Sequence, residues 1–525
     1  MRTLIKQQLY LAFGAICLVF SWVGTGDLFF LAFCALVPLL YFADKAQRFK
    51  TLFWHSYGYF LTFNLGTTWW IYVASPGGVF GAVLLNSLFM ALCFALPYWF
   101  LRGKSFRFFA MLSVWVSWEY LHQHWDLSFT WLNLGHVFAS QVNWVQFYSY
   151  TGILAGSIWV WLVNQNVFLW LQNKDFRHAL YVLLTILLPL SISYAVKPKL
   201  ENYMQGKPMQ VAVLQPNIDP YNEKFSAYGQ DLLLEALQKN ILVWQDADYL
   251  LLPETALVDY QGIWEDRLVS TRAVQEVLAQ TSVNAHLRII SGMDSQSEVR
   301  GIDTLQRGTR KERGFYYQAH NAAFWHLQGE PFQVYHKSKL VVGVELFPFE
   351  PILYPWFSNF LADLGGTTGT LAGQTQQTPF IDKTLHTKAA PIICYESLYG
   401  EFVGNFVKNG ANWIALITND AWWGDTPGYK QHLSLARLRA IETRKWIARS
   451  ANTGISAFID PLGGVHQATA YNTQTAIVQN IYPNTEQTFY SQYGDFLGRI
   501  SLFCVFLICL YAFRTLTLPK KYIVS

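Results

Sequence analysis

The chain has 525 residues, of which 52% are hydrophobic, 17% are aromatic and only 14% are charged. Soluble domains carry about 25% charged residues, so this composition excludes an ordinary soluble protein. The 38 Lys and Arg residues nearly balance the 34 Asp and Glu residues, and a net charge of +4 is too small and dispersed to predict a nucleic-acid partner. The length predicts more than one domain.

Apolar residues are concentrated in stretches long enough to cross a bilayer. A spanning helix takes about 20 mainly apolar residues, because each residue rises 1.5 Å through a core of about 30 Å. The first stretch lacks a small-residue cleavage site and a second follows at once, so we expect a retained helix and not a signal peptide. We predict a bundle of seven transmembrane helices over residues 1–200 and a C-terminal transmembrane helix over residues 496–516. In all there are about eight such stretches: residues 9–23, 28–43, 53–73, 79–101, 108–121, 150–171, 179–196 and 500–513.

Lys and Arg mark every second loop between these stretches. Residues 7–44, 51–101 and 108–173 contain no Lys or Arg, whereas the loops between them are basic. Positively charged loops stay in the cytoplasm, so both termini are predicted to be cytoplasmic and the long segment before the last stretch to lie outside. The basic clusters are Arg2 and Lys6; Lys45, Arg48 and Lys50; Arg102, Lys104 and Arg107; Lys174 and Arg177; and Arg514, Lys520 and Lys521.

Residues 208–490 have the pattern of a separate α/β domain. Short apolar runs of strand length alternate with helical patterns, which predicts a mixed sheet with helices packed on it. Residues 231–244 and 431–451 are the clearest predicted helices, and residues 321–337 are predicted to form a hairpin that turns at Gln328 and Gly329. The predicted strands contain residues 211–214, 249–252, 289–291, 332–335, 391–393 and 413–417.

Cys394 is the one cysteine of this domain, because the other cysteines lie in predicted spans. A lone thiol in an oxidising compartment is either buried filler or a retained nucleophile. Cys394 directly follows an apolar strand, and Glu254 and Lys337 also leave the ends of predicted strands. A carboxylate that takes the thiol proton, a thiolate that attacks a carbonyl and an ammonium that stabilises the oxyanion are the parts of an acyl-transfer site.

Four motifs in chain order carry a family resemblance. LPETA at residues 252–256, the segment around Lys337, ICYES at 393–397 and NDAWWGD at 419–425 resemble the motifs of the apolipoprotein N-acyltransferases. This family is the membrane-embedded branch of the nitrilase, or carbon-nitrogen hydrolase, superfamily. The resemblance implies a multi-pass α-helical membrane bundle joined to a nitrilase-like αββα sandwich, with Glu254 as general base, Lys337 as oxyanion stabiliser and Cys394 as nucleophile.

The resemblance also assigns supporting residues. Glu345 matches the second acidic residue of the family, and Tyr395 and Glu396 match the supporting residues beside the nucleophile. The segment 338–344 departs from the family pattern, and Lys339 competes with Lys337 for the oxyanion role. The preferred assignment is Lys337, because its spacing to Glu345 fits the family.

Aromatic residues are the candidates for binding the acyl substrates. Phe225 stands in a loop where the family commonly has a lid tryptophan, and Trp422 and Trp423 are either a pocket rim or core packing. Residues 346–364 are rich in aromatic residues and interrupted by prolines, and exposed apolar patches mark binding surfaces. We therefore predict an arm that dips into the outer face of the bilayer; the alternative is a loop packed on the domain. The candidates in the arm are Phe347, Trp356 and Phe360.

The resemblance implies a two-step acyl transfer in a bacterial inner membrane, with the catalytic domain on the periplasmic side. A glycerophospholipid would donate an acyl chain to Cys394, and the amino group of a diacylated apolipoprotein would accept it. The alternatives are a membrane-anchored amidase or phospholipase-like hydrolase that uses the same three residues, and a receptor or transporter with no activity. We expect no cofactor, because no metal-ligand cluster or phosphate-binding loop is found in the sequence. We also expect a monomer.

Overall fold

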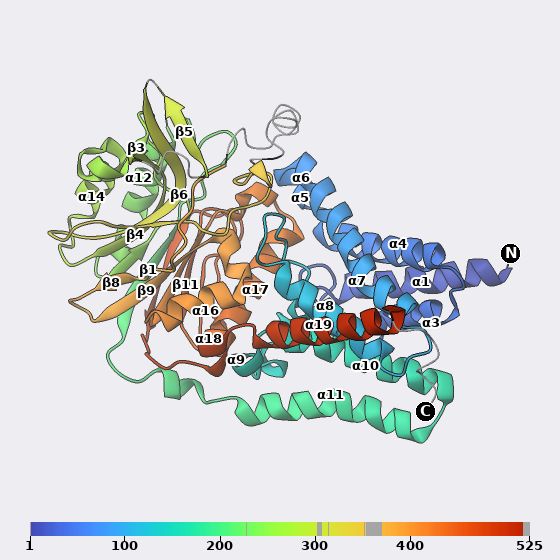
Figure 1. Ribbon diagram of the computed structural model, residues 1–525. Helices are drawn as coiled ribbons and strands as arrows, with labels where there is room; N and C mark the ends of the chain where they lie inside the picture. The colour runs from blue at the N-terminus through green and yellow to red at the C-terminus, as the bar shows by residue number, and fades with distance from the viewer. Residues whose placement is uncertain are drawn as a thin grey trace.

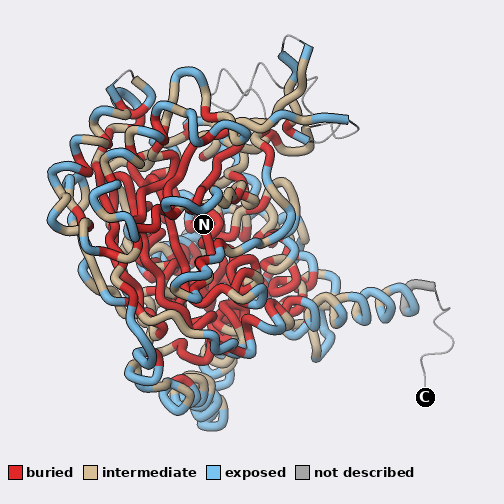
Figure 2. Tube along the Cα trace, turned by 90° about the vertical axis from the view of Figure 1, so that its left-hand side faces the viewer, coloured by how far each residue is buried: buried red, intermediate tan, exposed pale blue. Residues whose placement is uncertain are grey.

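The computed structural model describes residues 2–226, 228–301, 307–312, 314–350, 352 and 370–517 of the chain. These residues form a helical bundle and an α/β domain that lie side by side (Figure 1). One continuous hydrophobic core runs from the bundle, where it includes Phe138, into the domain, where it includes Leu416. Figure 2 shows buried segments, in red, throughout the interior of the molecule. The bundle and the domain are therefore packed against each other and are not joined only by a linker.

The bundle consists of residues 2–196 and the C-terminal helix. Helix is found in each stretch that the sequence predicts to span the membrane. The second stretch is divided into short helices because Pro38 lies in the first turn of α3, where proline starts a new helix. The helices are α1 (Arg2–Ser21), α2 (Ala32–Ala35), α3 (Val37–Lys45), α4 (Phe49–Thr68), α5 (Ile71–Ala74), α6 (Pro76–Phe80), α7 (Asn86–Phe100), α8 (Arg107–Leu121), α9 (Tyr148–Thr151), α10 (Leu154–Asn173), α11 (Phe176–Val196) and α19 (Phe496–Thr517).

Within the described residues, four helical segments are both long and apolar enough to cross a membrane: Pro76–Phe100, Leu154–Asn173, Phe176–Val196 and Phe496–Arg514. This is fewer than the eight predicted, and α8, with 15 residues, is shorter than the roughly 20 residues that a bilayer requires. In α11 and α19 only 6% of the apolar window is buried. Such a surface is stable in lipid and costly in water.

The α/β domain contains two sheets. The first has the strand order β14-β1-β2-β4-β6-β5, with β3 beside β4 and β7 beside β6, and the second has the order β13-β12-β11-β10-β9-β8. The first sheet comprises β1 (Met209–Gln215), β2 (Tyr249–Leu251), β3 (Ile263–Trp264), β4 (Arg288–Val299), β5 (Thr309–Glu312), β6 (Phe315–Leu327), β7 (Gln333–His336) and β14 (Thr475–Ile481). The second comprises β8 (Phe380–Asp382), β9 (Thr387–Ile393), β10 (Trp413–Thr418), β11 (Ile447–Ala451), β12 (Ala457–Ile459) and β13 (Val465–His466). The helices are α12 (Gly229–Lys239), α13 (Ile241–Trp244), α14 (Arg272–Thr281), α16 (Gly400–Lys408), α17 (Pro427–Thr443) and α18 (Phe489–Tyr493).

Strand β1 shows why the sheets form a sandwich. Val211 and Val213 belong to the core that β9 and β10 share, whereas Ala212 and Leu214 belong to a second core with α12 and α14. Successive side chains of a strand point to opposite faces, so an unbroken apolar run predicts a strand that is covered on both sides. The domain is therefore the predicted α/β sandwich, with helices outside two facing sheets (Figure 1).

Two predicted helices are wrong in extent. The helix predicted over residues 431–451 ends at Thr443, because Arg444 adopts a left-handed conformation and β11 starts at Ile447. The apolar periodicity continues through the break, which is why the sequence pattern missed it. The helix predicted over 231–244 is interrupted at Asn240. The predicted hairpin of residues 321–337 is confirmed as antiparallel β6 and β7.

One loop of the bundle, residues 122–133, makes polar contacts with the α/β domain, and we call it the junction loop. Its Ser128 accepts hydrogen bonds from the hydroxyl of Tyr395, through its carbonyl oxygen at 3.0 Å, and from the hydroxyl of Tyr399, through Oγ at 2.9 Å. The carbonyl oxygen of Gln123 accepts a hydrogen bond from Lys339 Nζ at 2.8 Å. Tyr395 follows Cys394 and Lys339 lies two residues after Lys337, so the loop contacts both segments that carry candidate catalytic residues.

Candidate active site

The three candidate catalytic residues leave the ends of three strands. Glu254 lies three residues after β2, Lys337 directly follows β7 and Cys394 directly follows β9. Cys394 adopts a left-handed backbone conformation with φ +50°, and it begins a short helical turn, Cys394–Leu398. Such strain in a residue other than glycine persists only where the surroundings impose it, and it is typical of functional sites.

A glycine permits the close approach of the Glu254 loop to the neighbouring strand. A Cβ atom on Gly292 of β4 would lie 2.5 Å from Thr255 N and 2.7 Å from Glu254 Cα. Thr255 has a φ of +46° and so also adopts the left-handed conformation. The loop is thereby held against β4 in one strained geometry.

The Lys337 ammonium lies between two carboxylates. Its Nζ is 2.9 Å from Glu254 Oε1 and 2.9 Å from Glu345 Oε1. Asn321, on β6, donates from Nδ2 to the same two oxygens at 2.8 Å each. Because the Lys337 backbone N–H donates to Asn321 O at 2.9 Å, the β6–β7 pairing fixes both residues together. The sequence did not point to Asn321, which has the appearance of an ordinary strand residue.

The second oxygen of Glu254 connects the two sheets. Glu254 Oε2 accepts a hydrogen bond from the backbone N–H of Asn419 at 3.0 Å, and Asn419 follows β10. In the parallel pairing of β9 with β10, Ile393 lies opposite Ile417, so the next residues, Cys394 and Thr418, are also neighbours. This register brings the thiol to the sheet edge where Glu254 is held.

Burial and the charges of these residues set their protonation states. Burial raises the pKa of the Cys394 thiol, and the Glu254 carboxylate raises it further, so the thiol is neutral at rest. Burial opposes the charge on Glu254, but the Lys337 ammonium and hydrogen bonds hold the pKa of this carboxyl below its ordinary value. Burial also opposes the charge on Lys337, yet Glu254 and Glu345 keep the pKa of its ammonium well above the usual range. The site thus holds a neutral thiol, an ionised carboxylate and an ammonium group.

Glu396 joins the nucleophile turn to the lysine segment. Its Oε2 accepts from the backbone N–H of Ile393 at 2.8 Å, and its Oε1 accepts from the Tyr335 hydroxyl at 2.6 Å and from Ser338 N at 2.7 Å. Burial raises the pKa of Glu396 to about 7 against the opposing effect of these hydrogen bonds. Glu396 therefore fixes the relative position of the residues before Cys394 and after Lys337.

The two lysines that follow β7 have different surroundings. Lys339 donates to Gln123 of the junction loop, and its Nζ lies 4.8 Å from the centre of the Tyr399 ring. Lys337 instead contacts Glu254 and Glu345, so of these two lysines it is the one beside the candidate base.

Lys224 is a second lysine of the site, and the sequence did not assign it a role. It is buried, and its Nζ donates to Glu254 O at 2.9 Å and to the Thr255 hydroxyl. Burial lowers the pKa of Lys224 to about 8, although the charges of Asp294, Glu254 and Cys394 oppose this shift. The sequence feature that could have pointed to Lys224 is its position in the loop after β1, directly before Phe225.

A buried hydrogen-bonded chain supports the nucleophile turn from behind. His432 contacts Asp420 Oδ1 at 3.0 Å through Nδ1 and Ser397 Oγ at 2.9 Å through Nε2. Ser397 Oγ donates to the carbonyl oxygen of Cys394 at 2.8 Å. All three side chains are buried, so they position the strained Cys394 backbone and do not reach solvent.

The candidate aromatic residues have different positions. Trp423 packs against Trp70 of the bundle with ring centres 5.0 Å apart, whereas Trp422 lies 5.2 Å from the ring of Tyr221. Phe225 is half-exposed beside Lys224. Phe347 is buried at the start of the predicted arm, so it is not part of an exposed surface. Trp356 and Phe360 lie outside the described residues.

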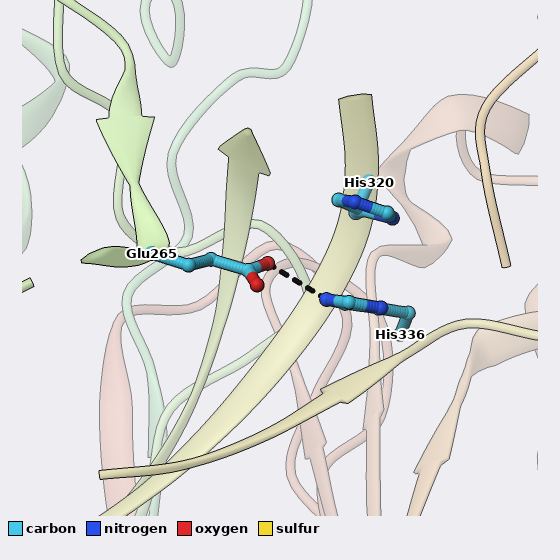
Figure 3. Close-up of side chains that lie close together, drawn as sticks. All are labelled: Glu265, His320 and His336. Carbon is cyan, nitrogen blue, oxygen red and sulfur yellow. Dashed lines mark hydrogen bonds and ion pairs between the residues drawn. The ribbon is translucent and has the colours of Figure 1, made fainter. Parts of the chain in front are cut away.

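One group among the described residues has the spacing of metal ligands: Glu265, His320 and His336 (Figure 3). His336 Nε2 lies 2.7 Å from Glu265 Oε1, and the two imidazole rings are stacked 3.7 Å apart with an angle of 10°. Each imidazole lone pair lies in the plane of its ring, so two parallel stacked rings do not direct both at one ion. The stacked rings of His320 and His336 lie on β6 and β7, next to Asn321 and Lys337, and their contact joins the two strands.

The sequence matches the models of two known protein families. The carbon-nitrogen hydrolase family model matches residues 210–488, more than half of the chain, so the protein belongs to the carbon-nitrogen hydrolases. The model of the apolipoprotein N-acyltransferase N-terminal domain matches residues 14–165. The chain is thus a member of the apolipoprotein N-acyltransferase family, which joins these two domains.

Individual relatives agree with this family. The chain is 28% identical over 488 residues to the apolipoprotein N-acyltransferase of Chlorobaculum tepidum, a match that covers 90% of each chain. It is 26% identical to the enzyme of the same name from Pasteurella multocida, over 88% of this chain and 87% of the relative. Among solved structures, an amidase from Nesterenkonia is 15% identical with a TM-score of 0.37, and the match covers 57% of this chain and 97% of the amidase.

Proposed function

We propose that this protein moves a fatty acyl chain from a glycerophospholipid, through a thioester on Cys394, to the α-amino group of the diacylglyceryl-cysteine of an apolipoprotein. The observation that carries the proposal is the buried group of Cys394, Glu254 and Lys337 in a chain that also has apolar helices of spanning length. Membership in the apolipoprotein N-acyltransferases supports the choice of acceptor.

In the first step Glu254 takes the Cys394 proton while the sulfur attacks the ester carbonyl of the phospholipid. Lys337 stabilises the oxyanion of the tetrahedral intermediate. When the intermediate collapses, the ester C–O bond breaks and the proton passes from Glu254 to the leaving alkoxide. A lysophospholipid leaves, and the acyl group remains on the sulfur as a thioester.

In the second step the neutral amine of the acceptor attacks the thioester carbonyl, again with Lys337 beside the oxyanion. Glu254 accepts a proton from the nitrogen and returns it to the departing Cys394 thiolate, so the amide forms and the free thiol is restored. Burial of the site limits water, which would otherwise hydrolyse the thioester.

The membrane arrangement is part of the proposal. We infer eight spans, both termini in the cytoplasm and the catalytic domain on the periplasmic side of a bacterial inner membrane. The support is the basic character of every second loop. With this orientation the domain lies on the side where lipoproteins are exposed after export.

Intact mass spectrometry tests the route. Purified protein is incubated with a phospholipid of defined acyl chains, beside a Cys394→Ala variant. We expect an acyl adduct on the wild type and none on the variant, followed by transfer to a diacylated lipopeptide with a free amine. Discharge of the adduct by water alone would favour a hydrolase with the same three residues, and absence of the adduct would refute the thioester route.

A further inference from the structure

A cavity of about 780 Å³ lies at one end of the helical bundle. Its walls are the end of α3, the turn between α7 and α8, and Gln165 of α10. Four of its lining residues are cationic and one is acidic: Lys45, Arg102, Lys104, Arg107 and Asp44. Ligand pockets typically have volumes of about 300–1,000 Å³, so this space is large enough for a small polar group.

The cavity lies at the end of the bundle that faces away from the catalytic domain. Helix α19 starts beside the domain, where Arg499 Nη1 lies 2.9 Å from Glu401 Oε1. Further along this helix, the Tyr511 ring lies 5.4 Å from the Phe106 ring and 5.8 Å from Lys104 Nζ. These positions on α19 are about 18 Å apart at 1.5 Å per residue, so the helix connects opposite ends of the bundle (Figure 1).

Aromatic rings hold the two guanidinium groups in place. Arg102 lies 4.8 Å from the centre of the Trp99 ring and Arg107 lies 4.6 Å from that of Tyr98. Arg107 Nη2 also contacts Asp44 Oδ1 at 3.1 Å, while Arg102 Nη2 donates to main-chain carbonyls at the end of α3. Within the part of the chain that the structure describes, the other N–H groups of Arg102 and Arg107 donate to no protein acceptor. They are available to an anion.

The turn itself is open. Gly103 has a φ of +79°, a conformation that suits glycine, and a Cβ atom there would meet no heavy atom within 4 Å. Lys104 is exposed beside it. Just outside the turn, the apolar side chains of Phe100 and Phe109 are exposed. Cationic groups on the turn are thus flanked by surface suited to hydrocarbon.

We propose that this cavity binds the phosphodiester head group of an anionic glycerophospholipid in the leaflet opposite the catalytic domain. Guanidinium groups match phosphate oxygens with paired hydrogen bonds. Basic pockets between helices on the cytoplasmic side are typical sites for anionic lipids. The acyl chains of the lipid extend along Phe100 and Phe109 into the bilayer.

A basic loop at this end of the bundle is not enough to form the cavity. Lys174 and Arg177 lie in another basic loop and do not line the cavity. They provide a control with the same loss of charge on the same side of the bundle. The comparison of the two loops separates a specific head-group site from general attraction to an anionic surface.

The test uses the delipidated full-length protein in neutral detergent. Binding is measured from thermal unfolding at increasing phosphatidylglycerol, with phosphatidylcholine and inorganic phosphate as the other additions. The variants are Arg102→Gln/Lys104→Gln, the single variant Lys104→Gln, and the control Lys174→Gln/Arg177→Gln. The single variant changes an exposed side chain, so it keeps the test open if the double variant does not fold. The Cys394→Ala protein serves as background, so the result does not depend on acyl transfer.

We expect phosphatidylglycerol to raise the unfolding temperature more than phosphatidylcholine does, and the apparent affinity to fall about tenfold or more in the double variant. The single variant weakens binding in the same direction, and the control binds as the parent does. Any lipid in the active site remains bound in all variants, so it cannot produce this difference. An equal stabilisation by inorganic phosphate, or an equal loss in the control, would overturn the proposal.

Discussion

Replacement of Lys224 by Met tests how the charge distribution of the site supports catalysis. Lys224 is buried and its Nζ holds the Glu254 carbonyl oxygen at 2.9 Å. Burial lowers the pKa of Lys224 from the ordinary value of 10.5 to about 8. That shift corresponds to about 3 kcal/mol against the charged form in the folded protein.

These quantities predict a small change in stability and a larger change in rate. Lys224→Met leaves the Glu254 carbonyl and the Thr255 hydroxyl unpaired, at a cost of about 1–3 kcal/mol each. It also removes a buried charge that disfavours folding by about 3 kcal/mol below pH 8. The two effects offset each other, so the free energy of unfolding changes by no more than about 3 kcal/mol. Displacement of the Glu254 loop is expected to slow acylation by about 10- to 100-fold.

The pH dependence gives the sign of the charge effect. The pKa of Lys224 is lower in the folded protein than in the unfolded chain, so the unfolded chain binds more protons between pH 8 and 10.5. The contribution of Lys224 to the free energy of unfolding therefore rises with pH across that range. Deprotonation above pH 8 also removes a cation beside Cys394, so wild-type acylation declines there. Lys224→Arg keeps its charge and is expected to lack this decline.

The assay is the time course of acyl-enzyme formation by intact mass spectrometry, from pH 6 to pH 10, with thermal unfolding of each variant. Lys239→Met is the matched control, because Lys239 is an exposed residue at the end of α12 that pairs with Glu235. A Lys224→Met protein with the rate and pH profile of wild type would refute the reasoning.

Three further substitutions test the surrounding contacts. Lys337→Met removes the cation that lowers the pKa of Glu254, so burial then raises that pKa. The pH below which acylation slows, because Glu254 is protonated, is expected to move to a higher value. Glu396→Gln places an amide against the N–H groups that Glu396 accepts from, and it is expected to slow acylation more than tenfold and to lower the unfolding temperature. Asp420→Asn leaves Arg449, which lies 2.7 Å from the Asp420 carboxylate in a buried pair, without its counter-charge, and costs about 3–5 kcal/mol of stability.

Each of these changes has an outcome that contradicts it. If the acid side of the acylation pH profile stays at the same pH in Lys337→Met, then Lys337 does not control the pKa of Glu254. Glu330→Gln, at an exposed position in the β6–β7 turn, is the control for Glu396→Gln, and equal effects of the two would show that Glu396 has no special role. Thermal unfolding of Asp420→Asn at the wild-type temperature would contradict the buried ion pair.

The sequence predicts the sandwich well, because a strand that is buried on both faces has apolar residues at every position. Runs such as residues 211–214 are apolar at every position, and both the inner and the outer core use them. The end of α17 could not be predicted in the same way, since Arg444 and Lys445 are buried and polar and the apolar periodicity passes through them. Their hydrogen bonds to distant segments, such as Lys445 to Asn484, are tertiary and leave no local pattern.

The sequence predicted which candidate residues lie at strand ends, but it did not predict the residue inside a strand that contacts them. Glu254, Lys337 and Cys394 each follow an apolar run, so residue type and position together point to a site. Asn321 lies inside β6, and only the pairing with β7 shows that its amide bridges Glu254 and Glu345. Lys224 is separated from Glu254 by 30 positions in the chain, and only the folded loop brings it to the Glu254 carbonyl.

The junction loop holds three segments of the α/β domain close to the candidate catalytic residues. Gln123 holds Lys339 of the segment that carries Lys337, and Ser128 holds Tyr395 of the turn that carries Cys394. Asp126 of the same loop accepts a hydrogen bond from Phe349 N at 2.8 Å, so the segment after Glu345 is attached as well. The segments that carry or adjoin the candidate catalytic residues are therefore held by the bundle as well as by the sheets. The position of the turn that carries Cys394 therefore depends in part on contacts with the bundle.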